Sequence, residues 1–239
     1  MKNYKAILFD LDGTLLHMPQ EPFLEGLYAA ESAEIAPKLG IDHKTFVDML
    51  NKGVYLMVKN SGACTNEEAF LNYALPLFQS GKEDSVKAFD DYYEGNFHKL
   101  KDIAPENPLA AEAVALAKEK AGLVILATNP IFPMSAQRAR LSWVGLTPED
   151  FDLVTFYGNS CYCKPNPDYY KEILAKFDLQ PQDCLMVGND VKEDMRCASS
   201  IGMDVYLVTD CLIDHGLDAT PYKQGSFAEF VDDLKNERI

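Results

Sequence analysis

The pattern of apolar and polar positions after residue 104 alternates between short apolar runs and longer helical repeats. With Ala6–Phe9 at the start of the chain, the runs with the length of buried strands are Leu123–Ala127, Leu153–Phe156, Cys184–Val187 and Val205–Val208. Helical spacing predicts helices over Pro108–Lys120, Met134–Val144, Pro167–Phe177, Lys192–Ile201 and Phe227–Asn236. Such alternation is typical of a parallel sheet with right-handed crossovers, so we expect α/β architecture with helices on both faces of the sheet.

The segment between the first apolar run and residue 104 has a different pattern, because it contains helical repeats and no convincing strand. The helices that we expect there are Pro22–Leu39, Lys44–Lys59, Asn66–Phe78 and Ser85–Leu100. The pattern therefore predicts an α/β core of residues 1–15 and 104–239, interrupted by an all-helical domain of residues 16–103. Large side chains at helical spacing are expected to form the core of this insert rather than a substrate site, and they are Tyr28, Tyr55, Met57, Tyr73, Tyr92, Tyr93 and Phe97.

The net charge of the chain limits which classes of binding partner we expect. It contains 22 Lys and Arg against 37 Asp and Glu, a formal net charge of −15. A field of that sign repels a polyanion, so we expect no nucleic-acid partner. A small phosphorylated substrate is still compatible, because local donors and a bound cation can hold one phosphate. We expect a monomer or a homodimer.

The six cysteines and the N-terminal sequence bear on the cellular compartment of the protein and on the redox state of its thiols. The apolar stretch near the N-terminus is interrupted by Asp10 and Asp12 and is not followed by a small-residue cleavage site, so it does not resemble a secretory signal. We therefore expect a cytoplasmic protein with free thiols and no membrane association. Cys161 and Cys163 have no second pair of Cys or His at zinc-ligand spacing.

Polar residues that can take part in catalysis or binding follow the apolar runs. Asp10-Leu-Asp-Gly-Thr14 places two carboxylates directly after the first run, so that one can attack while the other transfers protons. Thr128 and Asn129 follow the second run and can hold phosphate oxygens through a hydroxyl and backbone N–H groups. Because ligands bind beyond the carboxyl ends of strands in open parallel sheets, these residues are expected to converge.

Two further segments complete this set. Lys164, in Cys-Lys-Pro-Asn-Pro167, can neutralise both the Asp10 carboxylate and an incoming phosphate. Gly188-Asn-Asp-Val-Lys-Glu-Asp194 supplies carboxylates at Asp190 and Asp194, and hard oxygen ligands of this kind suit Mg²⁺.

With these segments in this order, the sequence resembles the haloacid dehalogenase superfamily over nearly its whole length. The resemblance implies a Rossmann-like core with a helical cap domain, and a magnesium-dependent phosphatase acting on a small phosphorylated metabolite through an aspartyl-phosphate. It implies that Asp10 is the nucleophile, Asp12 the general acid and base, Thr128 a phosphate ligand and Lys164 the charge stabiliser. Magnesium would be held by Asp10, Asp12 and the acidic motif, by which we mean Asp190 and Asp194 of the segment Gly188–Asp194.

One position departs from the family pattern. Asn189 directly follows Gly188, the glycine of the acidic motif, whereas family members commonly have an Asp there. The direct metal ligand is therefore open between Asp190 and Asp194. We favour Asp190, with Asp194 acting through water or holding Lys164, and expect Glu193 to be solvated. Phe132 and Met134 are expected to border the cleft.

Several rival activities stay open. Asp12, expected to be protonated because it lies among other carboxylates, argues against dehalogenation and phosphonate cleavage within the family. A phosphomutase would retain Asp12, and so would a non-catalytic phosphoprotein-binding module that kept the fold.

Overall fold

The computed structural model describes residues 2–239 and contains one six-stranded, wholly parallel sheet. The strand order is β3-β2-β1-β4-β5-β6. The strands are β1 Ala6–Phe9, β2 Leu123–Leu126, β3 Leu153–Val154, β4 Cys184–Gly188, β5 Asp204–Val208 and β6 Lys223–Gly225. The expected parallel sheet is confirmed. The polar strand β6 was not predicted, because Lys-Gln-Gly carries no apolar signal and pairs only as an edge strand.

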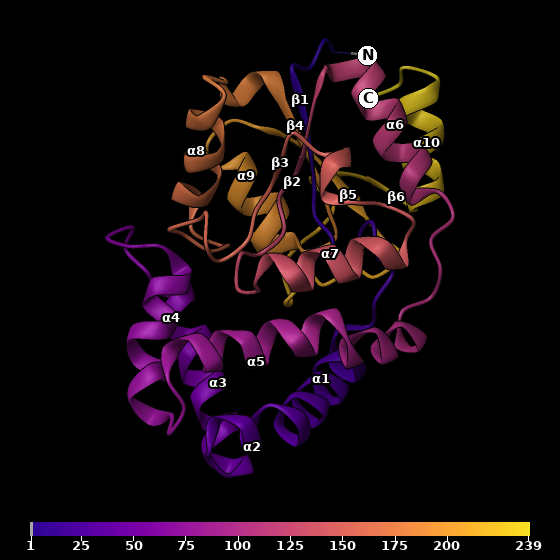
Figure 1. Ribbon diagram of the computed structural model, residues 1–239. Helices are drawn as coiled ribbons and strands as arrows, with labels where there is room; N and C mark the ends of the chain where they lie inside the picture. The colour runs from indigo at the N-terminus through magenta and orange to yellow at the C-terminus, as the bar shows by residue number, and fades with distance from the viewer. Residues whose placement is uncertain (1) are drawn as a thin grey trace.

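The alternation of side chains along β1 explains why helices cover both faces of the sheet. Ile7 and Phe9 pack with α6 (Ala110–Ala121) and α10 (Phe227–Lys235), whereas Ala6 and Leu8 pack with α8 (Pro167–Lys176) and α9 (Cys197–Ser199). Figure 1 shows these two pairs of helices on opposite sides of the strands. A strand buried on both faces requires a continuous apolar run, which is what β1 contains.

The register aligns the carboxyl ends of the three central strands. Phe9 lies opposite Leu126 of β2 and Val187 of β4, so the chain leaves all three strands at the same level. The strand order reverses here, since the chain passes from β1 to β2 on one side and returns to β4 on the other. A site is expected at such a reversal.

The helices between β1 and α6 gather beyond this edge of the sheet, as the purple and magenta ribbons in Figure 1 show. They are α1 Gln20–Glu34, α2 Ala36–Leu39, α3 His43–Val58, α4 Asn66–Ala74 and α5 Lys82–Glu94, with 3-10 turns at Leu75–Leu77 and Asn96–Ile103. We call residues 20–103 the helical insert. Helix α5 packs against α7 (Met134–Trp143) of the core.

Three predicted helices of the insert are broken in the structure, and one of them, Asn66–Phe78, ends at Ala74 and continues as the 3-10 turn Leu75–Leu77. Pro22–Leu39 is interrupted at Ile35, where Pro37 lies in the first turn of α2 and cannot continue the hydrogen bonding of α1. Ser85–Leu100 ends at Glu94, because Gly95 leaves helical geometry before the 3-10 segment begins. In the core, the predicted helix Lys192–Ile201 opens with a π-helical turn, Val191–Arg196, before α9.

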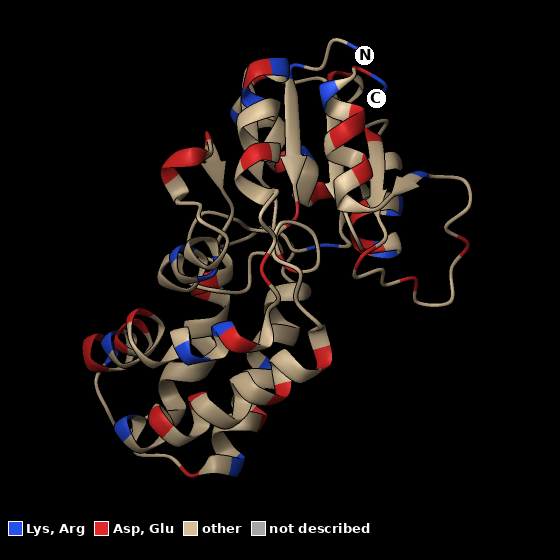
Figure 2. Cartoon of the chain, turned by 90° about the vertical axis from the view of Figure 1, so that its right-hand side faces the viewer, with Lys and Arg blue, Asp and Glu red and all other residues tan. Residues whose placement is uncertain are grey.

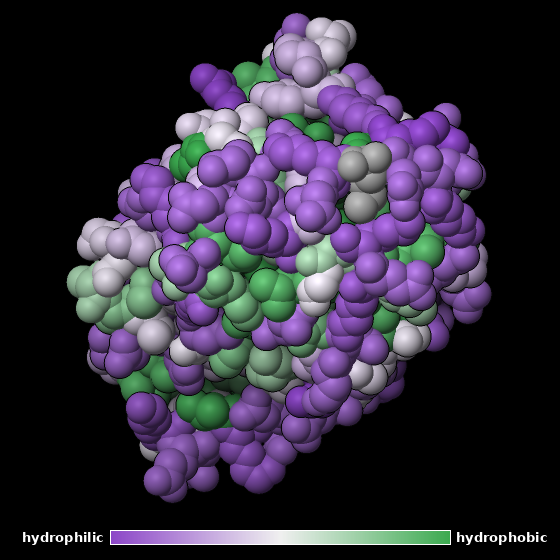
Figure 3. All heavy atoms as spheres, turned by 90° about the horizontal axis from the view of Figure 1, so that it is seen from above, coloured by the Kyte–Doolittle hydropathy of each residue, from purple (hydrophilic) through white to green (hydrophobic). Residues whose placement is uncertain are grey.

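The surface is mostly polar. Acidic segments occur on helices of both the core and the insert in Figure 2. Seen from above, the face opposite the insert is largely hydrophilic, with hydrophobic atoms between the polar groups (Figure 3). The six cysteines form no disulfide within the described residues. Within residues 2–239, no helix combines the length and apolarity needed to cross a membrane.

Candidate active site

The loop after β1 carries Asp10 and Asp12 into the crevice between the core and the insert. Asp10 continues the strand pairing, since its N–H donates to the Val187 carbonyl at 2.9 Å. Gly13 has φ +91°, and a Cβ there would lie 2.2 Å from the Asn189 amide nitrogen. Glycine at this position therefore permits both the turn and the close approach of the β4 loop.

Lys164 lies between two carboxylates at the centre of the site. Its Nζ is 2.8 Å from Asp10 Oδ1 and 2.6 Å from Asp194 Oδ1. The lysine side chain is 1% exposed, so water does little to screen these contacts. Burial acts to lower the pKa of Lys164, but the two carboxylates outweigh it and hold that pKa well above its usual range. The lysine therefore stays protonated and neutralises charge at this point.

The nucleophile candidate has one oxygen available. Burial raises the pKa of Asp10, and Lys164 acts in the opposite direction by stabilising the carboxylate. Only Oδ1 of Asp10 takes part in a side-chain hydrogen bond within residues 2–239. The geometry thus orients Asp10 with one oxygen fixed and the other available to attack.

Asp194 and Asp190 of the acidic motif lie in different environments. Asp194 is 1% exposed, and its second oxygen accepts a hydrogen bond from the Asp190 N–H at 3.1 Å. Its oxygens are therefore engaged by Lys164 and the backbone. Asp190 caps the π-helical turn with Oδ1 and contacts His215 with Oδ2 at 2.7 Å. Since the His215 side chain is 39% exposed, another ligand can replace His215 at Asp190 Oδ2.

The donor set fits Mg²⁺ better than a metal that needs a full set of side-chain ligands. Residues 2–239 contain no group of three or more His, Cys, Asp or Glu side chains arranged as such a set. However, Asp10 and Asp190 line the same cavity, and the Asp12 main-chain carbonyl accepts no hydrogen bond from the described residues. Mg²⁺ typically takes one or two carboxylates and keeps several waters, which these oxygens can provide.

Asp12 faces a guanidinium, a contact that the sequence did not predict. Arg140 of α7 is fully buried and donates through Nη1 to Asp12 Oδ2. It also donates to Gln137, and its Cζ lies 4.4 Å from the centre of the Phe132 ring. A charge-assisted hydrogen bond of this kind fixes the orientation of Asp12. Asp12 Oδ1 is buried and has no partner among residues 2–239.

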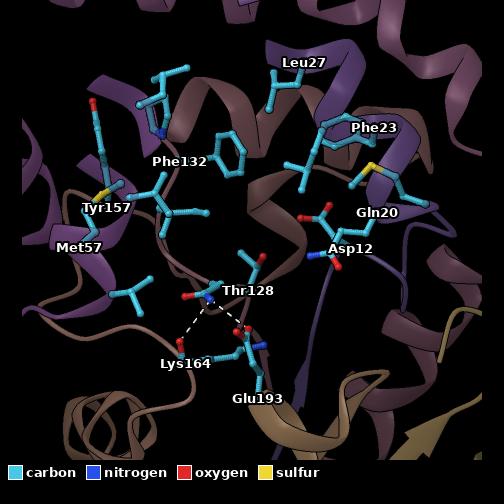
Figure 4. Close-up of a pocket in the computed structure, with 18 of the residues that line it drawn as sticks. Asp12, Gln20, Phe23, Leu27, Met57, Thr128, Phe132, Tyr157, Lys164 and Glu193 are labelled. Atoms are coloured by element: carbon cyan, nitrogen blue, oxygen red, sulfur yellow. Dashed lines mark hydrogen bonds between the residues drawn. The ribbon is translucent and has the colours of Figure 1, made fainter. Parts of the chain in front are cut away.

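The segment after β2 supplies groups suited to phosphate. Thr128 is 2% exposed, and its carbonyl accepts hydrogen bonds from Thr155 at 2.7 Å and Tyr169 at 2.8 Å. These bonds fix the backbone while the Thr128 side chain lines the cavity (Figure 4). The backbone N–H groups of Leu11, Asp12 and Asn129 make no hydrogen bond to the described residues. Free N–H groups that line such an edge can hold phosphate oxygens.

Glu193 is partly buried, whereas we expected a solvated side chain. Its Oε2 accepts a hydrogen bond from Asn129 Nδ2 at 3.0 Å, drawn dashed in Figure 4, and burial raises its pKa to about 7. The π-helical turn that begins after Asp190 places this side chain toward Asn129. Sequence spacing alone predicts an ordinary helix here and does not reveal that direction.

The cavity continues from these groups into the helical insert and has a volume of about 360 Å³. Three residues assigned to the core of the insert, Tyr28, Met57 and Tyr93, line it. Phe132 lines it as expected, whereas Met134 is not among its lining residues. The wall also contains Glu31, which is 2% exposed and accepts a hydrogen bond from the Tyr93 hydroxyl. Burial raises the pKa of Glu31 to about 7.

Among the residues near the site that sequence reasoning missed are Arg140 and Glu31. Both lie within helices, where a charged residue usually faces solvent. The only available signal was their position in otherwise apolar or small surroundings, such as Ala136 and Ala139 beside Arg140.

Comparison with known proteins agrees with this arrangement. Residues 4–202 match the family model described as haloacid dehalogenase-like hydrolase, and the chain belongs to that family. It is 28% identical to a ribulose-1,5-bisphosphate 5-phosphatase of Halopiger xanaduensis, over 84% of this chain and 83% of that one. It is 26% identical to a phosphoglycolate phosphatase of Vibrio vulnificus, over 83% and 80% of the two chains.

A solved structure shows the same fold. The magnesium-bound hydrolase YfnB of Bacillus subtilis superposes with a TM-score of 0.57 at 14% identity, over 98% of this chain and 100% of that one.

Proposed function

We propose that this protein is a magnesium-dependent phosphatase that hydrolyses a small phosphorylated metabolite through an aspartyl-phosphate on Asp10. The observation that carries the proposal is the buried contact of Lys164 with Asp10 and Asp194, beside three free backbone N–H groups. A carboxylate with one free oxygen, a fixed cation and converging donors are the parts that phosphoryl transfer to an aspartate requires.

In the first step, the free oxygen of Asp10 attacks phosphorus and the bond from phosphorus to the ester oxygen breaks. Lys164 and the N–H groups of Leu11, Asp12 and Asn129 hold the phosphoryl oxygens while charge is redistributed. Asp12 in its protonated form gives its proton to the leaving oxygen, so the products of this step are an alcohol and phosphorylated Asp10.

In the second step, the Asp12 carboxylate takes a proton from water, and the water oxygen attacks phosphorus. Inorganic phosphate leaves and the Asp10 carboxylate is regenerated. The hydrogen bond from Arg140 holds Asp12 in one orientation for both proton transfers. We therefore assign Arg140 as a positioning residue.

Mg²⁺, held by Asp10, the Asp12 main-chain carbonyl and Asp190, would supply positive charge that offsets the repulsion between a carboxylate and a phosphate dianion. Asp194 then serves by holding Lys164 rather than as a direct ligand, since both of its oxygens are engaged. We further propose that residues 16–103 act as a cap domain on a core of residues 1–15 and 104–239. The cavity between them would exclude water from the first step.

The test is turnover of an activated aryl phosphate by the purified protein with and without added Mg²⁺. Asp10→Asn is expected to lower kcat by at least about 1,000-fold, as removal of a nucleophile does. Asp48→Asn is the matched control, because this exposed aspartate lies on α3 away from the cavity. Intact mass after rapid quench should show one added phosphoryl group that Asp10→Asn lacks. A wild-type protein that binds phosphate but never turns over would instead support a non-catalytic binding module.

A further inference from the structure

The cavity beside Asp10 has an apolar extension inside the helical insert. Figure 4 shows Phe23, Leu27 and Phe132 on the side of the cavity away from Lys164. Its volume of about 360 Å³ lies at the lower end of the range of about 300–1,000 Å³ typical of small-molecule sites. Aliphatic side chains from four helices of the insert form much of the wall, and they are Leu27, Leu50, Val54, Met57, Leu71 and Val86.

The charges of the cavity are distributed unevenly. Of the described residues, Lys164 alone among the lining residues is a lysine or arginine, and its charge is shared between Asp10 and Asp194. Arg140 is fully buried against Asp12 and is not part of the lining. On the side of the insert the titratable group is Glu31, whose Oε2 accepts no hydrogen bond from residues 2–239.

This distribution bears on which substrates can be accommodated. The reacting phosphate can use Lys164 and the free N–H groups at the sheet edge. A second phosphate or a carboxylate on the same substrate would enter an apolar chamber in which none of the described lining residues of the insert is a lysine or arginine and one is a buried carboxyl group. An uncompensated charge in such surroundings is strongly unfavourable.

We propose, resting on the phosphatase function above, that the substrate is the phosphate monoester of an apolar alcohol with no second anionic group. The aliphatic wall binds the alcohol, and Glu31 with its neighbours rejects an anion there. Such a substrate would differ from the substrates named for the two relatives, which are ribulose-1,5-bisphosphate and phosphoglycolate.

The first test is kcat/KM for methyl, propyl and hexyl phosphate and for phosphoglycolate. Each added methylene is expected to raise kcat/KM about fourfold until the chamber is filled, because its transfer from water is favourable. Propyl phosphate and phosphoglycolate are a matched pair of similar size, and the carboxylate is expected to lower kcat/KM at least about tenfold. If phosphoglycolate is the better substrate, or chain length has no effect, the proposal is wrong although the protein is a phosphatase.

The second test separates binding from turnover, using the wild-type protein with Mg²⁺ and calorimetry of hexylphosphonate against phosphonoacetate, neither of which has an ester bond to cleave. Hexylphosphonate is expected to bind at least about tenfold more tightly. Val54→Lys, which adds a cation to the wall, should narrow that ratio, whereas Tyr55→Lys on the exposed side of the same helix should leave it unchanged. Tight hexylphosphonate binding without hydrolysis of any ester would overturn the phosphatase function and retain the apolar site. Equal binding of the two phosphonates would overturn the apolar site.

Discussion

Replacing Glu31 with glutamine is expected to stabilise the folded protein at alkaline pH and to change its stability little at acidic pH. Glu31 is 2% exposed, and burial raises its pKa from 4.5 to about 7, while the hydrogen bond from the Tyr93 hydroxyl acts in the opposite direction. The folded state therefore binds the Glu31 proton more tightly than the unfolded state does. Glutamine resembles the protonated side chain and has no proton to lose.

The sign and magnitude follow from this difference. Below pH 4.5, Glu31 is protonated in both the folded and the unfolded state, and its ionisation costs no stability. Between pH 4.5 and about 7 the unfolded state ionises Glu31 while the folded wild-type protein keeps the proton, so stability falls over this range and the loss is complete above about pH 7. A pKa raised from 4.5 to about 7 corresponds to about 3 kcal/mol in the free energy of unfolding. The variant should avoid most of that loss.

Urea unfolding of both proteins at about pH 5 and about pH 8 measures the effect, with the free energy taken from linear extrapolation. The stability of Glu31→Gln relative to wild type is expected to rise by about 2–3 kcal/mol between these two pH values. Every other titrating group is common to both proteins and cancels in the comparison. Glu25→Gln is the control, since Glu25 is exposed on the same helix. A difference between Glu31→Gln and wild type that does not change with pH would refute the reasoning.

Three further outcomes test the assignments at the sheet edge. With an activated aryl phosphate, Asp12→Asn should accumulate phosphorylated Asp10 because water lacks its base, and normal steady turnover without a trapped species would contradict the role of Asp12. Arg140→Lys should lower kcat by about tenfold with little change in KM, because lysine keeps the charge but loses the planar contact; equal changes in both constants would contradict a positioning role. Asp190→Asn should raise the Mg²⁺ concentration for half-maximal activity more than Asp194→Asn does, and metal titrations with the reverse order would make Asp194 the direct ligand.

Local pattern in the sequence determined the architecture of the core and much of the site. The apolar run Ala6–Phe9 could only be a strand buried on both faces, and the strands and helices that follow alternate as a parallel sheet requires. Because parallel strands end at one edge, the positions of Asp10 and Thr128 directly after two such ends were sufficient to predict that they line one cavity. These inferences depend on neighbouring residues in the chain, which a single sequence displays directly.

The remaining features depend on contacts between residues that are far apart in the chain. The partner of Asp12 lies 128 residues away on a helix whose pattern does not distinguish a buried arginine from an exposed one. The burial of Glu31 and the apolar chamber arise where α1, α3, α4 and α5 meet the core, and helical periodicity shows which residues share a face but not what that face encloses. Strand β6 has no apolar signal because its hydrogen bonds to β5, rather than its side chains, define it. Tertiary packing therefore decided the electrostatics of the site and the shape of its cavity, since both are set by which distant groups exclude water from one another.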